Sequence, residues 1–228
     1  LVGYWKMDEA SGNAADSSGN GTTLTNNNIT PFNTGKFANA PTFNGSTMYF
    51  STATTISAVQ TISFWAKPAS TTDNYIHLAT GKYINSTSGT VAATGFTTPV
   101  VYVNGVQTTT IAASSWQLVT VTDTSGISAS AFEVGRANGS YAANTSQIDD
   151  VRLYNRALSP AEVFQLYNWG PGPVAYWQME EDSGSRNDSS GNGYALSVAA
   201  GNVTAKPGKF GDGAYFPNTA GDYLSVTD

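Results

Sequence analysis

The sequence contains no cysteine and only one histidine, His77. The absence of cysteine excludes thiol nucleophiles, disulfide bonds, cysteine-ligated zinc sites and iron–sulfur clusters. A Ser-His-Asp triad could use only His77, and the sequence has neither a G-x-S-x-G nucleophile elbow nor a phosphate-binding G-K-[ST] loop. These absences remove the common thiol, serine-hydrolase and nucleotide-binding chemistries from consideration.

Charged residues and long apolar runs are also scarce. Only 11% of the residues are charged, and 10 Lys and Arg against 16 Asp and Glu give a net charge of -6. This balance leaves no basic patch of the kind that binds nucleic acid. No apolar run approaches the roughly 20 residues of a membrane-spanning helix. We therefore expect neither nucleic-acid binding nor membrane insertion.

The abundant residue types are those of strands and turns. Thr, Val, Ile, Tyr and Trp favour pleated strands, whereas Gly, Asn, Asp and Ser favour the turns between them. A chain of 228 residues with 40% hydrophobic residues can bury a core, as one domain or as one domain and part of another. The chain starts at Leu1 without a signal-peptide pattern, which indicates a mature or excised piece. Because secreted bacterial surface proteins often lack cysteine, we expect an extracellular or cell-surface location.

An internal repeat organises the chain. The pattern Y-W-x-M-x-E, followed by D-S-S-G-N-G, occurs within residues 4–21 and again within 176–193, and G-K-F occurs at 35–37 and at 208–210. The chain therefore divides into one full repeat, a Pro/Gly linker and the first third of a second repeat, at residues 1–168, 169–173 and 174–228. A third of a repeat rarely folds alone. We expect either that the polypeptide continues past Asp228 or that a neighbouring molecule supplies the missing strands.

Short strands and one late helix are predicted within the first repeat. Alternating or apolar runs predict strands at 2–7, 61–67, 100–103, 116–122 and 148–154. Asn104-Gly105 predicts a tight hairpin turn between strands at 100–103 and 106–111. Ser159 and Glu162 form a capping box with a proline between them, which predicts a helix over 160–167. This pattern predicts an all-β sandwich, with Trp5, Trp65 and Trp116 packed in its core or on a sheet face.

Several motifs together carry a family resemblance. Y-W-K-M-D-E-A-S-G at 4–12, T-I-S-F-W-A-K-P at 61–68, Y-V-N-G-V at 102–106 and I-D-D-V-R-L-Y-N-R-A-L-S at 148–159 resemble the laminin-G-like, concanavalin A-like domains of bacterial surface and secreted proteins, within the lectin–glucanase superfamily. The resemblance covers the whole chain and implies a jelly-roll β-sandwich of two antiparallel sheets, used as an accessory module. The family often has an Asp-Tyr pair, present as Asp222-Tyr223, where the first repeat has Met48-Tyr49.

The sequence does not predict catalysis. Glycosidases need a pair of carboxylates about 5–9 Å apart across the sugar bond, and the related glucanases carry them in an E-x-D-x-x-E string that is absent here. Asp149 and Asp150 are adjacent, so regular strand alternation would point them to opposite faces. His77, in N-Y-I-H-L-A, is expected to be a strand histidine without a partner cluster. We therefore expect a protein that is not an enzyme.

The resemblance also implies a calcium ion that joins the N-terminal strand, an early glycine turn and the late strand. Calcium takes six to eight oxygen ligands from carboxylates and carbonyls. The candidate ligands are Asp8, Asp16, the carbonyl of Gly45, and Asp149. In the alternative interpretation, Asp16 forms an Asx-turn within D-S-S-G-N-G and Asp149 pairs with Arg152 or Arg156.

Two classes of function remain. The tandem copies and the stiff linker favour a structural or adhesive repeat in an extended stalk or filament, whose partners are neighbouring repeats or copies of itself. The alternatives are a carbohydrate-binding, lectin-like module and the accessory domain of a secreted glycoside hydrolase. For a glycan ligand, Tyr75, Tyr83 and Tyr141 lie near turns and are the candidates to stack on sugar rings.

Overall fold

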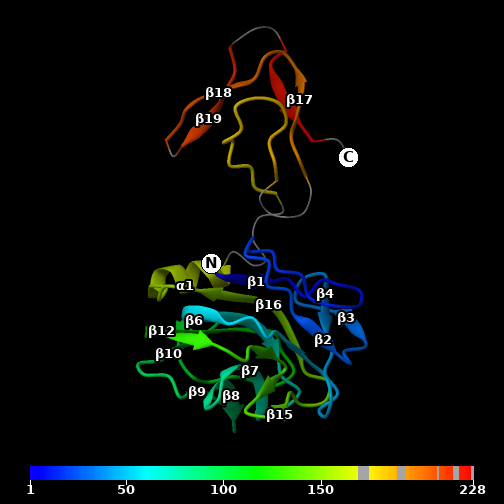
Figure 1. Ribbon diagram of the computed structural model, residues 1–228, viewed down its shortest axis with the longest axis vertical. Coiled ribbons are helices and arrows are strands. Elements are labelled where there is room, and N and C mark those ends of the chain that lie inside the picture. The colour runs from blue at the N-terminus through cyan, green and yellow to red at the C-terminus, as the bar shows by residue number, and fades with distance from the viewer. Residues whose placement is uncertain (169–174, 189–193, 210, 218–220, 227–228) are drawn as a thin grey trace. The chain divides into compact units, whose positions relative to one another are not determined.

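In a computed structural model the chain forms two compact units, Leu1–Asn168 and Trp169–Asp228 (Figure 1). The structure describes residues 1–168, 175–188, 194–209, 211–217 and 221–226. The predicted linker at 169–173 lies outside these residues. Among the described residues, no helix has the length and apolar character needed to cross a bilayer.

The first unit is built on two six-stranded antiparallel sheets. The first sheet has the order β1-β16-β6-β12-β10-β11, formed by Gly3–Trp5, Gln147–Tyr154, Ile56–Lys67, Gln117–Ala129, Val100–Val103 and Val106–Gln107. The second sheet has the order β2-β5-β13-β7-β8-β9, formed by Thr25–Asn27, Tyr49–Ser51, Glu133–Val134, Asp73–Ala79, Lys82–Thr87 and Thr90–Thr94. The predicted all-β sandwich is confirmed.

Two short hairpins and one helix complete the first unit. The hairpins are β3–β4, formed by Phe32–Thr34 and Asn39–Pro41, and β14–β15, formed by Arg136–Ala137 and Ser140–Tyr141. The helix α1 spans Pro160–Asn168, close to the predicted range. Its capping box is formed as expected, because the Ser159 backbone N–H donates to Glu162 Oε2 at 2.8 Å and the Glu162 backbone N–H donates to Ser159 Oγ at 3.4 Å.

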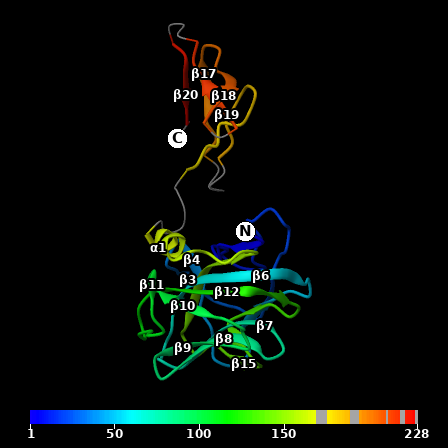
Figure 2. The same ribbon diagram turned by 90° about the vertical axis from the view of Figure 1, so that its left-hand side faces the viewer.

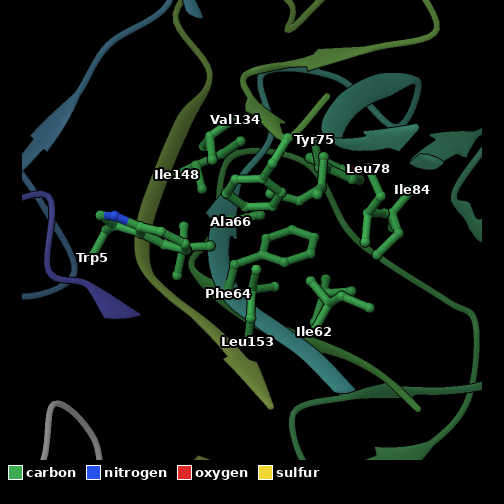
Figure 3. Close-up of a cluster of buried hydrophobic side chains, with 14 of the residues drawn as sticks. Trp5, Ile62, Phe64, Ala66, Tyr75, Leu78, Ile84, Val134, Ile148 and Leu153 are labelled. Atoms are coloured by element: carbon green, nitrogen blue, oxygen red, sulfur yellow. The ribbon is translucent and has the colours of Figure 1, made fainter. Parts of the chain in front are cut away.

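The core fills the space between the two sheets. Along β6, the alternate residues Ile62, Phe64 and Ala66 are buried and face the second sheet, where the ring of Tyr75 packs on Phe64 with centroids 5.5 Å apart (Figure 3). Trp5 at the start of the chain joins the same apolar cluster. Because strand residues alternate between faces, one face of each sheet packs in the core.

The other face of the first sheet is covered by the rest of the unit. Figure 2 shows α1 beside the β6–β12 layer and outside the sandwich. Tyr167 of the helix lies 5.8 Å from Trp65, between ring centroids, and Phe37 meets Trp65 edge-on at 5.9 Å. The Leu158 N–H donates to Thr61 Oγ1 at 3.0 Å, so polar residues on this face are buried but bonded. This sheet therefore has little face left for a ligand.

The predicted hairpin at Asn104-Gly105 is present, but its second strand is shorter than expected. Both turn residues have positive φ, 53° and 77°, as a two-residue turn between twisted strands requires. The strand β11 ends at Gln107 instead of reaching 111. The chain then crosses to the second sheet, where the Ile111 N–H donates to the Gly89 carbonyl at 2.9 Å. These bonds to another strand pair end the hairpin.

The second unit contains two two-stranded antiparallel sheets within its described residues. One joins β17, Ser197–Ala200, to β20, Tyr223–Ser225, and the other joins β18, Thr204–Pro207, to β19, Asp212–Tyr215. Isolated bridges join Trp177 to Asp188 and Arg186 to Leu196. The first unit has the same kinds of bridge, from Trp5 to Asp16 and from Ala14 to Leu24.

Candidate functional site

The outer face of the second sheet carries a row of polar and aromatic side chains. The residues paired in register across five strands are Ser51, Glu133, His77, Tyr83 and Thr94. The neighbouring row, formed by Phe50, Val134, Ile76 and Ile84, is fully buried in the core. Because strand residues alternate between faces, the first row faces away from the core. None of its members is buried.

An arginine lies between two tyrosines at one end of this row. The guanidinium carbon of Arg136 is 4.9 Å from the ring centroid of Tyr49 and 5.2 Å from that of Tyr141, and the two rings meet edge-on at 6.0 Å. Arg136 Nη1 donates to Glu133 Oε1 at 3.1 Å. We name Tyr49, His77, Tyr83, Glu133, Arg136 and Tyr141 the outer-sheet cluster.

His77 is held in one orientation by the backbone. The Asn138 N–H donates to His77 Nδ1 at 3.2 Å, so the neutral ring carries its proton on Nε2. Burial lowers the pKa of His77 below its usual value, and the charge of Glu133 offsets this only in part. His77 is therefore neutral at pH 7 and presents an N–H donor.

The cluster has the chemistry of a binding surface for a neutral, hydroxyl-rich ligand. Tyrosine rings offer apolar faces on which the C–H face of a sugar can stack. Glu133 accepts hydrogen bonds, His77 Nε2 donates them, and the charges of Glu133 and Arg136 offset each other. Glu133 is the only carboxylate of the cluster, whereas glycoside hydrolysis needs two. The arrangement therefore suits binding better than hydrolysis.

The three predicted tyrosines have different environments. Tyr83 and Tyr141 belong to the outer-sheet cluster and are partly exposed. Tyr75 is only 1% exposed, and its hydroxyl oxygen lies 2.7 Å from Ser86 Oγ. The β7–β8 register shifts between Asn74 and Ile76, and this irregularity turns Tyr75 into the core although regular alternation would place it beside His77 on the outer face. Tyr75 is therefore removed from the candidates for sugar stacking.

Sequence reasoning missed most of the cluster. The expectation that His77 has no partner cluster is wrong, because β13 pairs with β7 and places Glu133 directly opposite His77. Tyr49 and Arg136 come from strands far apart in the chain, and no local pattern connects them. A signal was present at Tyr49, which aligns with Tyr223 of the second repeat, but a repeated tyrosine says nothing about its neighbours in space.

The structure brings two of the four predicted calcium ligands together. Asp8 and Asp149 interact electrostatically, and Oδ1 of each is buried without a hydrogen-bond partner. The other oxygen of Asp149 accepts a hydrogen bond from the Phe37 N–H at 2.9 Å. Burial raises the pKa of Asp149 to about 8, and the charges of Asp150 and Asp8 add to this shift. Burial also raises the pKa of Asp8.

The other two predicted ligands make other contacts. Asp16 accepts backbone hydrogen bonds from Tyr4, Ser18 and Thr22 at 3.1, 2.8 and 2.9 Å, as the Asx-turn interpretation expects. Burial would raise the pKa of Asp16, but these hydrogen bonds hold it below its usual value. Gly45 lies against the backbone of Asn144 at a positive φ of 77°.

The expected pairing of Asp149 with an arginine is wrong. Arg152 Nη2 instead lies 2.9 Å from Asp150 Oδ2, and Arg156 Nη2 lies 2.7 Å from Glu162 Oε1. A β-bulge between Asp149 and Arg152, with Asp150 at a φ of 53°, interrupts the regular alternation that was assumed for the two aspartates. Asp149 is thus left as a buried carboxyl group without a cation among the described residues.

The fit of this acidic pair to calcium is partial. Two carboxylate oxygens without partners are the hard oxygen donors that calcium prefers. Among the residues that the structure describes, no group of three or more His, Cys, Asp or Glu side chains could hold a metal ion. Backbone carbonyls and water would have to supply the remaining ligands of a calcium ion at Asp8 and Asp149.

Comparison with known proteins agrees with this architecture. Residues 89–164 match the Laminin_G_3 family, described as the concanavalin A-like lectin/glucanases superfamily. The β-sandwich of the first unit is similar to a concanavalin A-like domain. The match spans β9 to most of α1 of this domain and confirms the resemblance drawn from the motifs. No curated protein sequence matches the chain significantly.

Solved structures with the same fold include two binding domains. The botulinum neurotoxin type G receptor binding domain is 12% identical, with a TM-score of 0.53, over 95% of this chain and 65% of that one. The binding domain of Paraclostridial mosquitocidal protein 1 is 16% identical, with a TM-score of 0.51, over 97% of this chain and 69% of that one. At these identities the likeness concerns the fold alone.

Proposed function

We propose that the concanavalin A-like domain is a non-catalytic carbohydrate-binding module that serves as an adhesive repeat of an extracellular or cell-surface protein. The observation that carries the proposal is the outer-sheet cluster. It gathers tyrosine rings, one neutral histidine and one carboxylate on the sheet face that α1 does not cover. A sandwich whose other outer face is occupied by a helix has this face available for a ligand.

Each part of the cluster has a role in the proposed binding. Tyr141 and Tyr83 stack on the apolar faces of sugar rings. Glu133 accepts and His77 Nε2 donates hydrogen bonds with sugar hydroxyl groups. Arg136 acts as a positioning residue, because its guanidinium lies over both Tyr49 and Tyr141 and is bonded to Glu133. Holding these side chains in place before binding lowers the entropic cost of ordering them.

A purely structural role is the second candidate function. The internal repeat supports it, since tandem copies of one module are the usual construction of extended surface proteins. In this case the partners are neighbouring repeats or further copies of the chain, assembled in a stalk or filament. The two roles are compatible, because an adhesive repeat can also act as a spacer.

We further propose that calcium stabilises the first unit at Asp8 and Asp149. The two unpartnered carboxylate oxygens support this proposal, because a buried carboxylate oxygen without a hydrogen-bond partner is costly and a bound cation would offset that cost. Asp8 follows β1 and Asp149 lies in β16, so the ion would join the first and last strands of the unit. Its role would be structural.

A glycan array tests the proposed binding. We expect the intact chain to bind at least one neutral glycan and the Tyr141→Ala variant to lose that binding. Phe164→Ala is the matched control, because it removes an exposed aromatic ring from α1, outside the cluster, and should leave binding unchanged. Absence of binding by the parent chain, or equal binding by Tyr141→Ala, would reject the carbohydrate role. Filaments of the parent chain under the electron microscope would then favour the structural role.

A further inference from the structure

The β14–β15 hairpin carries two residues of the outer-sheet cluster and lies against β7. Arg136 of β14 and Tyr141 of β15 are paired in register. Asn138 and Gly139 form the turn between them, with positive φ values of 49° and 81°, as a tight two-residue turn requires. Figures 1 and 2 both show β15 close to β7 and β8. The position of this hairpin therefore sets the positions of the Arg136 and Tyr141 side chains.

The base and the tip of the hairpin are joined to β7 by different groups. At the base, the Gly135 N–H donates to the Tyr75 carbonyl at 2.8 Å. At the tip, the Asn138 N–H donates to His77 Nδ1 at 3.2 Å. A bond between backbone groups does not change with pH in the ordinary range, whereas an imidazole nitrogen can be protonated. The hold on the tip is therefore sensitive to pH in a way that the bond at the base is not.

The proton that acid adds to His77 goes to the atom that holds the tip. Nε2 already carries a proton in the neutral ring, so the second proton must enter at Nδ1. The new Nδ1–H would face the Asn138 N–H, which places one donor against another, and the hydrogen bond is lost. Nε2 still donates in the protonated ring. Protonation therefore undocks the tip without removing the donor that His77 offers to a sugar.

The charges around His77 act in the same direction. Glu133 of β13 lies directly opposite His77 and attracts the protonated ring, whereas Arg136 of the hairpin repels it. The neutral phenols of Tyr83, opposite His77 on β8, and of Tyr141 add no charge. Glu133 Oε1 also lies 3.1 Å from Arg136 Nη1, so a cation on His77 competes with Arg136 for this carboxylate. Both the repulsion and the competition weaken the hold on the hairpin.

We propose that His77 is a pH-operated latch, which docks the tip of the β14–β15 hairpin through Asn138 when neutral and releases it when protonated. Burial lowers the pKa of His77 below its ordinary value of 6.5, because the folded state disfavours the charged ring. The latch is therefore closed at pH 7 and opens as the pH falls through this lowered pKa. His77 is thus a positioning residue for Arg136 and Tyr141. The effect of the latch on sugar affinity rests on the proposed function, whereas the latch itself does not.

Nuclear magnetic resonance on the intact chain tests the latch directly. His77 is the only histidine, so the imidazole signals belong to it alone. The imidazole nitrogen shifts and the hydrogen-exchange protection of backbone amides are followed from about pH 7.5 to about pH 4.5. We expect the protection factor of the Asn138 amide, corrected for the intrinsic exchange rate, to fall at least about fivefold with the midpoint of the imidazole titration. The Gly135 amide at the base should keep its protection.

Two variants separate His77 from other titrating groups. His77→Asn places an oxygen acceptor close to the position of Nδ1 and cannot be protonated in this range, so the Asn138 amide should stay protected throughout. His77→Ala removes the acceptor and should leave that amide unprotected throughout. Asp73, which accepts the Ala143 N–H at 2.7 Å beyond the hairpin, is present in all three proteins. An equal fall in His77→Asn, or constant Asn138 protection while the parent imidazole titrates, would overturn the latch.

The glycan array, probed with the parent chain over the same pH range, separates the latch from the proposed function. If the latch positions the sugar site, binding to neutral glycans should weaken at least about threefold at the acid end, with the midpoint that the imidazole shows. Equal binding at both ends of the range would overturn the regulation of the site and leave the carbohydrate role standing. Absence of glycan binding at every pH would reject the carbohydrate role, and amide exchange would still decide the latch.

Discussion

The indole of Trp5 stacks on the ring of Phe132, with centroids 5.1 Å apart and planes inclined by 26°. Both side chains are fully buried. The contact joins the first strand of the first unit to the segment that leads into β13. It therefore fastens the beginning of the chain to the second sheet and helps to hold β1 at the edge of the first.

Removal of this contact should destabilise the first unit strongly. For Phe132→Ala we expect a loss of about 3–5 kcal/mol in the free energy of unfolding, because the change leaves a cavity beside Trp5. Denaturant unfolding of the first unit, followed by tryptophan fluorescence, measures the loss. Phe164→Ala changes the same residue type at an exposed position and should cost no more than about 0.5 kcal/mol. Similar losses for the two variants would show that the stack does not anchor the strand.

Substitutions at Glu133 distinguish glycan binding from glycan hydrolysis. Glu133→Gln keeps an acceptor oxygen, so we expect glycan affinity to stay within about threefold of the parent, whereas Glu133→Ala should weaken it about tenfold by loss of one hydrogen bond and of the Arg136 contact. Isothermal titration with a glycan that the array identifies measures both. The contrary result is that the parent chain hydrolyses the glycan and releases new reducing ends. If Glu133→Gln abolishes that release, the non-catalytic assignment is wrong.

Calcium should raise the melting temperature of the parent chain through Asp149. At a calcium concentration of 100 times the dissociation constant, a bound ion adds about 2.7 kcal/mol to stability. We expect this increment to vanish in Asp149→Asn and in Asp8→Asn, and to persist in Glu133→Gln, a carboxylate change in the second sheet. Melting curves recorded in calcium and in chelator provide the comparison. Identical curves for the parent chain in the two solutions would exclude the calcium proposal.

The stability of the first unit in chelator should depend on the ionisation of Asp149. Its pKa is raised to about 8 in the folded state by burial, whereas an unfolded aspartate has a pKa of about 3.9. Between these values the folded state binds the extra proton, so stability falls as pH rises from about 4 to about 8 and then levels off. Asp149→Asn should remove this contribution. Urea unfolding at several pH values measures it, and an unchanged pH slope in the variant would refute the assignment.

Local features of the fold were well predicted from the sequence. The Asn104-Gly105 turn and the Ser159–Glu162 capping box form as expected, because each depends on residues that are neighbours in the chain. The strands around 61–67 and 148–154 follow from their own alternation. Where the sequence prediction erred, as with the length of the second hairpin strand, bonds to a distant strand override the local preference.

The candidate site was predicted only in fragments. Tyr83 and Tyr141 were among the candidates, but their companions His77, Glu133 and Arg136 become neighbours only when β13 inserts between β5 and β7. Tyr75 was also predicted as a sugar-stacking residue, but the irregularity in the β7–β8 register turns its side chain from the outer face into the core. Strand pairing over long sequence separations cannot be deduced from a pattern of period two, which specifies faces but not partners.

The sequence by itself determined that this chain is an all-β protein with an internal sequence repeat, lacking the residues of thiol, serine-hydrolase and phosphate-loop chemistry. These conclusions rest on composition, spacing and self-similarity, which folding does not change. The tertiary structure decided which sheet face remains open, because only the packed positions of α1 and Trp65 show that the first sheet is covered. It also decided that Asp8 and Asp149 interact electrostatically, since burial and electrostatics arise only when distant segments meet.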